Sequence, residues 1–261
     1  ADAVENAKSG HPGMPMGIAE VVTVLFAKHL KFNPKKPEWE DRDRFILSAG
    51  HGSMLIYSLL YLLGYPKISM EHIKSFRKVN SPAAGHPEFG ELPGIETTTG
   101  PLGQGLGNGL GMAISEKIMR HRYGKNTFNH NTYILAGDGC LMEGISHEFA
   151  SLAGHLNLSN LVLIYDDNKI SIDGPTSLTM SDNTLERFNS LGWHTISVDG
   201  YNLLEIDDAL KKAKLDPRPS LISCQTLIGY GAPNKQNTAG SHGAPLGEEE
   251  IQMAKKNMKW N

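Results

Sequence analysis

Two oxygen-bearing side chains follow two apolar runs of the sequence, thirty positions apart. Asp138 stands in Gly137-Asp138-Gly139 after the apolar run 132–136, and Asn168 ends Asp166-Asp167-Asn168 after the run 161–165. The residues between them, 143–156, have helical spacing of apolar side chains. A strand–helix–strand unit would bring both side chains to the same edge of a parallel sheet.

Carboxylate and amide oxygens at such an edge suit Mg²⁺ that carries a diphosphate, because Mg²⁺ binds through one or two side chains plus phosphate oxygens. The main-chain carbonyl of Ile170 is a candidate third ligand, and Gly139 can bring its N–H close to a phosphate because it has no Cβ. Taken singly, each motif is more often a plain turn after a strand. The pairing favours the site.

Four histidines lie in glycine-rich segments that we expect to be loops: His11, His51, His86 and His242. Neutral imidazoles near pH 7 can pass protons or hydrogen-bond to hydroxyl and phosphate oxygens. Zinc is the alternative, but the close ligand spacing typical of zinc sites is missing. We interpret the other seven histidines as structural or surface residues.

The acids Glu143 and Glu148 occupy the expected helix 143–156. They are either functional residues or purely structural ones. In the structural reading, one is an acid in the first turn that favours the helix dipole, and the other lies on the solvated face. Alternating glycines over 103–111 never satisfy G-x-G-x-x-G, and no P-loop motif occurs. A nicotinamide enzyme and a P-loop NTPase are therefore unsupported.

The elements that must position these residues alternate along the chain. We expect strands at 44–48, 132–136, 161–165, 195–198 and 221–226, and helices at 16–30, 51–63, 69–79, 103–121, 143–156, 185–191, 203–212 and 248–256. Long loops cover 80–101 and 226–247. Alternation of this kind predicts one α/β domain, with a parallel sheet of about five strands and helices on both faces.

Composition agrees with a globular protein: 39% of the 261 residues are hydrophobic and 20% are charged. The net charge of −3 gives no electrostatic case for nucleic acid, and no apolar run is long enough for a membrane span. Two cysteines far apart, Cys140 and Cys224, favour a reducing, cytoplasmic compartment.

At this point the sequence resembles the N-terminal, diphosphate-binding (PP-type) domain of the transketolases, which are thiamine-diphosphate enzymes. The resemblance runs from end to end and rests on residues 8–17, 48–55, 85–88, 98–105, 137–144, 165–168 and 240–247. The Asp138 to Asn168 motif alone indicates only a thiamine-diphosphate enzyme. The histidine segments indicate a transketolase.

The resemblance implies roles for individual residues. Asp138, Asn168 and the Ile170 carbonyl would bind the metal, which we expect to be Mg²⁺ with Ca²⁺ and Mn²⁺ as alternatives. A second set would contact thiamine diphosphate: His51, Gly100, Pro101, Leu102, Gly139, Asp166, Asn168 and His242. A third set would act in catalysis: His11, His86 and His242 in the substrate channel, and Glu143 and Glu148 near the subunit interface.

The implied activity is transfer of a two-carbon ketol unit from a ketose phosphate to an aldose phosphate. The family's pyrimidine-binding and C-terminal domains find no counterpart in residues 1–261, so we expect an N-terminally trimmed single domain with little turnover alone. Its partner would be a second copy in a full-length homodimer, or a chain carrying the pyrimidine-binding domain. The alternatives are another ketol transferase of the deoxyxylulose-phosphate synthase kind and a non-catalytic cofactor-binding module.

Overall fold

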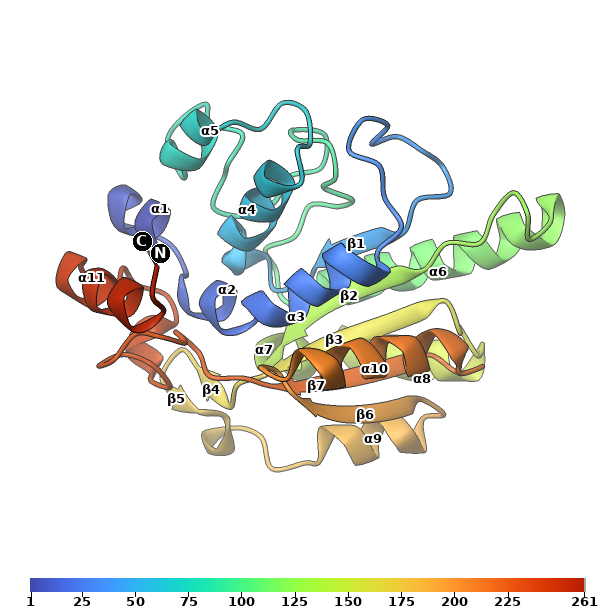
Figure 1. The fold of residues 1–261 in the computed structure, drawn as a ribbon. Coiled ribbons are helices and arrows are strands. Elements are labelled where there is room, and N and C mark those ends of the chain that lie inside the picture. The colour runs from blue at the N-terminus through green and yellow to red at the C-terminus, as the bar shows by residue number, and fades with distance from the viewer. Residues whose placement is uncertain (261) are drawn as a thin grey trace.

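A five-stranded parallel sheet forms the centre of the structure, a computed structural model that describes residues 1–260 (Figure 1). Its strands stand in the order β1-β2-β3-β7-β6. Their bounds are Arg44–Leu47 for β1, Thr132–Gly137 for β2, Leu161–Asp167 for β3, His194–Asp199 for β6 and Ser220–Gln225 for β7. All four pairings are parallel. The predicted fold class is confirmed.

Register brings the predicted site residues to one edge of the sheet. Strand β2 pairs with β3 so that Gly137 stands opposite Asp166. Every residue of β3 is buried, as expected for a central parallel strand covered on both faces. Because β3 extends to Asp167, Asp166 and Asp167 belong to the strand, and only Asn168 lies beyond it.

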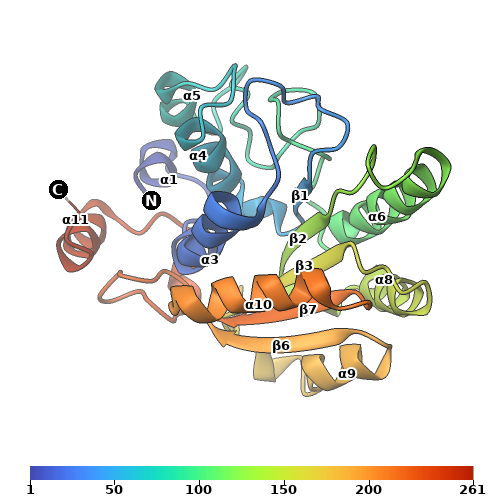
Figure 2. The ribbon, with the colours of Figure 1, turned by 45° about the vertical axis from the view of Figure 1, so that its right-hand side comes forward.

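Helices cover both faces of the sheet, as Figures 1 and 2 show. On one face, α10 (Leu203–Leu215) packs against β6, β7 and α3 (Ala19–Val24). On the other lie α6 (Gln104–Tyr123), α8 (Gly144–His155) and α9 (Thr184–Ser190), and Trp193 packs between Phe149 of α8 and Phe188 of α9. No helix within residues 1–260 is long and apolar enough to cross a membrane.

The remaining helices surround the carboxyl edge and the upper part of the molecule in Figure 1: α1 (Asp2–Ala7), α2 (Gly13–Gly17), α4 (Met54–Leu62), α5 (Met70–Lys74), α7 (Asp138–Met142) and α11 (Glu248–Asn257). Close packing of α6 depends on its glycines. A Cβ at Gly105 would lie 2.7 Å from the Cα of Ser48, and one at Gly109 would lie 2.4 Å from Ile134 Cδ1. These glycines let α6 approach β1 and β2.

Several helix boundaries differ from the sequence-based prediction. The predicted helix 16–30 is divided into α2, α3 and a π-helical turn over Leu25–His29, because Ile18 leaves helical geometry at φ −102° and ψ 5°. The predicted helix 69–79 shrinks to α5. The predicted helix 143–156 begins at Gly144, since Glu143 is extended.

Two elements at the carboxyl edge were not predicted. Helix α7 begins at Asp138, where a turn was the alternative, and a short hairpin of β4 (Ile170–Ser171) and β5 (Gly174–Pro175) follows Asn168. Both are too short for a periodic pattern to register in the sequence. Residues of both elements line the site described below.

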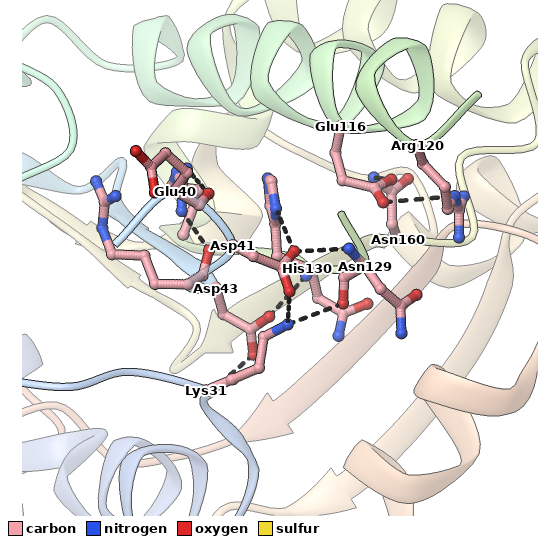
Figure 3. A network of polar contacts seen from close by, with 12 residues as sticks. Lys31, Glu40, Asp41, Asp43, Glu116, Arg120, Asn129, His130 and Asn160 are labelled. Atoms are coloured by element: carbon pink, nitrogen blue, oxygen red, sulfur yellow. Dashed lines mark hydrogen bonds and ion pairs between the residues drawn. The ribbon is translucent and has the colours of Figure 1, made fainter. Parts of the chain in front are cut away.

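The amino edge of the sheet, on the opposite side, is tied together by a buried polar network (Figure 3). Asp43 accepts hydrogen bonds from the main-chain nitrogens of Lys31 (2.8 Å) and Asn131 (2.7 Å). Asp41 contacts Lys31 Nζ at 2.7 Å and His130 Nδ1 at 3.2 Å. This network fixes the segments that enter β1 and β2, and so fixes the register that reaches the carboxyl edge.

Candidate functional site

A cavity of about 290 Å³ opens at the carboxyl edge of β2 and β3. It gathers eleven of the residues predicted from the sequence: His11, His51, His86, Gly100, Leu102, Asp138, Gly139, Asp166, Asn168, Ile170 and His242. A larger and more open hollow between α1 and α11 is lined by scattered charged side chains and brings no comparable set together. The smaller cavity is therefore the candidate site.

Asp138 follows β2 directly and is 4% exposed. Its Oδ1 accepts a hydrogen bond from the Tyr165 hydroxyl, whereas its Oδ2 is buried and has no partner within residues 1–260. Burial raises the pKa of Asp138 to about 6. A buried carboxylate oxygen without a donor is costly unless a cation binds there, so this atom fits a metal ligand.

Asn168 lies beside it with its amide held in one orientation. Its Nδ2 donates to Asp166 Oδ2 at 2.9 Å, and its Oδ1 accepts from the main-chain nitrogen of Ile170 at 3.0 Å. Asp166 is buried, and its Oδ1 accepts a hydrogen bond from the Thr226 hydroxyl. Lys169 turns the chain with φ +63°, and Ile170 then lines the cavity as the hairpin begins.

The donor set fits Mg²⁺ better than it fits zinc. Within residues 1–260, no three His, Cys, Asp or Glu side chains are grouped so that they could hold a metal ion. The set predicted from the sequence contains a single carboxylate with an amide and a main-chain oxygen, which leaves room for the phosphate oxygens and water that Mg²⁺ retains. Nitrogen and sulfur ligands, which zinc favours, are not required.

Gly139 packs against Leu102, and both residues line the cavity. A Cβ at Gly139 would lie 2.9 Å from Leu102 Cδ1, closer than side-chain atoms normally approach. Leu102 comes from the segment that leads into α6, so a bare glycine here lets two distant parts of the chain meet. The same lack of a side chain exposes the Gly139 N–H to a ligand.

Three of the four predicted histidines form a cluster among the residues that line the cavity. The ring centroids of His11 and His51 are 4.9 Å apart, those of His51 and His242 5.3 Å, and those of His11 and His242 5.8 Å. Burial lowers the pKa of His11 to about 4 and that of His51 to about 3, and it also lowers the pKa of His242. These imidazoles are neutral at pH 7.

The fourth histidine, His86, lies next to Gly100, where an added Cβ would be 3.3 Å from the imidazole ring. Burial, and then the charge of Arg77, lowers the pKa of His86. Arg77 also donates to Ser9 Oγ at 2.9 Å. This arginine therefore links the segment that carries His11 to the segment that carries His86.

The structure does not bring every predicted residue to the cavity. Pro101, Glu143 and Glu148 are exposed and are not among its lining residues, so their roles remain predictions. His51 lies on a short 3-10 turn, Gly50–Gly52, and the helix predicted over 51–63 begins only at Met54.

Sequence reasoning also missed residues that support the site. The hydroxyl of Tyr165 donates to Asp138, and the hydroxyl of Thr226 donates to Asp166. Ile172 and Ile228 add apolar side chains to the cavity lining. The position of Tyr165 at the end of a predicted strand was visible, but its partner was not, because that partner, Asp138, follows the neighbouring strand β2 and begins α7.

Comparison with known families gives one match over the whole chain. The family described as "Transketolase, thiamine diphosphate binding domain" matches residues 1–261. The chain is 56% identical over 265 aligned positions to the transketolase of Buchnera aphidicola subsp. Acyrthosiphon pisum, covering 100% of this chain and 40% of that protein. It is 57% identical to transketolase 1 of Aliivibrio fischeri, covering 99% of this chain and again 40% of the relative.

Solved structures agree with this match. A transketolase from Campylobacter jejuni superimposes with a TM-score of 0.97 at 46% identity, over 100% of this chain and 41% of that one. A transketolase from Pichia stipitis in complex with sedoheptulose-7-phosphate gives a TM-score of 0.96 at 45% identity, over 100% of this chain and 39% of that one. The chain thus spans about 40% of the length of the curated relatives it matches.

Proposed function

The chain belongs to the family of transketolase thiamine diphosphate binding domains, and from this premise we propose that it holds the diphosphate and metal of that cofactor for ketol transfer between sugar phosphates. The proposal treats residues 1–261 as a single domain. It assigns Asp138, Asn168 and the Ile170 carbonyl to a divalent metal, with Mg²⁺ as the first choice and Ca²⁺ or Mn²⁺ as alternatives.

One observation carries the metal assignment. Asp138 Oδ2 is buried without a partner in the same cavity as Asn168 and Ile170. Burial of such an atom costs about 1–3 kcal/mol or more when nothing compensates it. A cation bound at this atom, together with the diphosphate it carries, would offset that cost.

In this proposal, the residues around the diphosphate bind the cofactor and orient it. Gly139 offers its main-chain N–H, and His51 is close enough to His11 and His242 to share one ligand with them. Gly100, Pro101 and Leu102 would lie against the rings of the cofactor, and Asp166 would act through Asn168 and His242. When bound, thiamine diphosphate supplies a nucleophilic carbon and an electron sink for breaking the carbon–carbon bond of a ketose.

The histidines are suited to the substrate. His11, His86 and His242 have lowered pKa values and are therefore neutral at pH 7, where an imidazole can both donate and accept a hydrogen bond. Polyhydroxylated sugars require such groups to align their hydroxyls and to move protons to and from them. The Pichia stipitis relative, solved with sedoheptulose-7-phosphate, supports sugar phosphates as the substrate class.

A second polypeptide region is part of the proposal. The chain spans about 40% of its relatives, and we propose that the pyrimidine-binding part of the site comes from a second copy within a full-length homodimer or from a separate chain. Glu143 and Glu148 are exposed on and before α8, where a partner subunit could contact them. The free, buried Cys140 and Cys224 agree with a reducing, cytoplasmic compartment.

The test is a titration of thiamine diphosphate with and without Mg²⁺, on the chain combined with a polypeptide that supplies the pyrimidine-binding domain. Wild-type chain should bind in a metal-dependent way, and Asp138→Asn should lose that dependence. Asp173→Asn, an exposed acid on the nearby hairpin, is the matched control and should behave as wild type. Cofactor binding that ignores Mg²⁺ would contradict the proposal.

Activity separates the proposal from its alternatives. The combined polypeptides should transfer a two-carbon unit from a ketose phosphate to an aldose phosphate, and the chain alone should show little turnover. Metal-dependent cofactor binding without any transfer would favour the non-catalytic module. Transfer to glyceraldehyde phosphate from pyruvate, with release of CO₂, would favour a deoxyxylulose-phosphate synthase.

A further inference from the structure

We propose that Arg77 fixes the position of His11 relative to His86 in the cavity, and that it thereby controls ketol transfer without taking part in cofactor binding. The inference rests on the proposed function, which assigns these two histidines to the sugar phosphate. Arg77 is not among the residues that line the cavity, so it acts through its neighbours and is a positioning residue.

The two histidines come from distant segments of the chain. His11 and His86 both line the cavity. Within residues 1–260, however, no hydrogen bond joins residues 8–14 directly to residues 80–101. The connection between them is made through a third segment, residues 76–77, which follows α5.

On one side, this third segment holds the chain just before His11. Arg77 Nη1 donates a hydrogen bond to Ser9 Oγ at 2.9 Å. Gly10, which has φ +137°, lies against the ring of Phe76, because an added Cβ there would be 2.9 Å from Phe76 Cε1. Two adjacent residues therefore contact two adjacent residues, and both contacts directly precede His11.

On the other side, Arg77 holds the chain just before His86. Its main-chain nitrogen donates to the main-chain oxygen of Ala83 at 2.9 Å. Its guanidinium lies against Gly85, where an added Cβ would be 3.0 Å from Nε, so even a methyl group at this position would crowd it. One residue thus connects the approach to His86 with the segment that carries the other histidine.

The loop that carries His86 also has an anchor of its own. The hydroxyl of Tyr57, on α4, donates to the main-chain oxygen of His86 at 3.2 Å, and Ser53 Oγ donates to the oxygen of the preceding residue at 2.9 Å. Loss of the Arg77 side chain should therefore leave this loop docked on α4. What it removes is the link to the segment before His11.

Arg77 keeps its position at a cost to stability. Its backbone lies in the left-handed region, with φ +60°, which residues other than glycine rarely adopt. Its Nε is buried and has no hydrogen-bond acceptor within residues 1–260. Strained backbone and unsatisfied buried donors gather at functional positions, because a residue that only stabilises the fold would not retain them.

The experiment uses the chain combined with the polypeptide that supplies the pyrimidine-binding domain, and it measures ketol transfer per mole of bound thiamine diphosphate. Arg77→Met should lower kcat/KM for the ketose phosphate at least about tenfold, because misplacement of a group by about 1 Å can cost about a hundredfold. Its Mg²⁺-dependent affinity for thiamine diphosphate should stay within about twofold of wild type. Lys78→Met, which removes an exposed charge next to Arg77, is the matched control and should behave as wild type.

Ser9→Ala separates the contact from the charge of Arg77, because it removes the hydrogen-bond acceptor and leaves the guanidinium in place. It should lower kcat/KM at least about threefold. The double variant should lie no more than about twofold below Arg77→Met, because both changes break one contact. Losses that multiply would overturn the inference. A wild-type kcat/KM in Ser9→Ala would also overturn it, because the effect of Arg77 would then come from its charge alone.

Normalising to bound cofactor removes the contribution of molecules that fail to fold. A merely structural role for Arg77 would leave kcat/KM per loaded site unchanged in Arg77→Met, and that result would overturn the inference alone. Cofactor affinity that falls in parallel with transfer would contradict it as well. A wild-type protein without ketol transfer would instead overturn the proposed function, and the role of Arg77 with it.

Discussion

Asn168 Nδ2 donates a 2.9 Å hydrogen bond to Asp166 Oδ2, and this contact decides which end of the Asn168 amide can face a ligand. The reverse orientation would set the amide oxygen against a buried carboxylate and the amide nitrogen against the N–H of Ile170. Asp166 near the end of β3 and Asn168 just beyond the strand therefore determine the chemistry offered at the carboxyl edge of β3.

Replacing Asn168 by Asp should destabilise the metal-free chain by about 2–4 kcal/mol at pH 8, because two carboxylates would then face each other in a buried place. Urea unfolding without metal measures the loss. The exchanged pair, Asp166→Asn with Asn168→Asp, restores one amide and one carboxylate and should recover most of the stability. A double variant no more stable than Asn168→Asp would show that the pair is not the cause.

The close approach of Gly139 and Leu102 gives a second prediction. Gly139→Ala places a methyl group 2.9 Å from Leu102 Cδ1 and should reduce the free energy of unfolding by about 1–2 kcal/mol through overpacking. The same substitution in a Leu102→Ala background should cost less than about 0.5 kcal/mol, because the opposing atom is gone. Equal costs in the two backgrounds would refute a direct contact.

His130 gives a prediction for pH. This histidine lies in the polar network at the amino edge, next to Asp41 and Lys31 (Figure 3). It is 6% exposed, and the charge of Arg44 also acts on it. Burial, and then the charge of Arg44, lowers its pKa from 6.5 to about 4, although Asp41 opposes this. Between pH 6.5 and about 4, His130 therefore binds a proton in the unfolded chain but not in the folded chain. The contribution of His130 to stability is complete above pH 6.5 and is lost as the pH falls toward 4.

The measurement is the free energy of unfolding at pH 7 and at pH 4.5, compared between wild type and His130→Gln. Wild type should lose more stability over this interval than the variant, by an amount on the order of 2 kcal/mol. His121→Gln, an exposed histidine at the end of α6, is the control and should match wild type. A His130→Gln profile parallel to that of wild type would place the pH dependence elsewhere, for example at His11 or His51.

The regular part of the fold could be predicted because its signals are local. The apolar runs at 132–136 and 161–165 are strands, and they pair in parallel with Gly137 opposite Asp166. Once such strands are recognised, the rules of parallel sheets bring Asp138 and Asn168 to one edge. Four histidines could be selected as candidates because the glycine-rich segments that carry them are also a local signal. All four line the cavity.

Other features could not be predicted because they depend on contacts between distant segments. The break of the helix at 16–30 coincides with tight packing, since a Cβ at Gly17 would lie 2.7 Å from the main-chain oxygen of Leu227. The short hairpin β4–β5 has too few residues to show a period. The clustering of His11, His51 and His242 unites three segments that no spacing rule connects.

The sequence by itself determined the class of fold, the edge at which the chemistry gathers and the identity of the ligand-bearing residues, because strand periodicity and parallel pairing act over short ranges. Only the tertiary structure decided which oxygen of Asp138 is free, which way the Asn168 amide faces and which imidazoles touch. Those choices depend on Tyr165, Asp166 and the packing of loops far apart in the chain, and hydrogen bonds across strands leave no trace in the order of the residues.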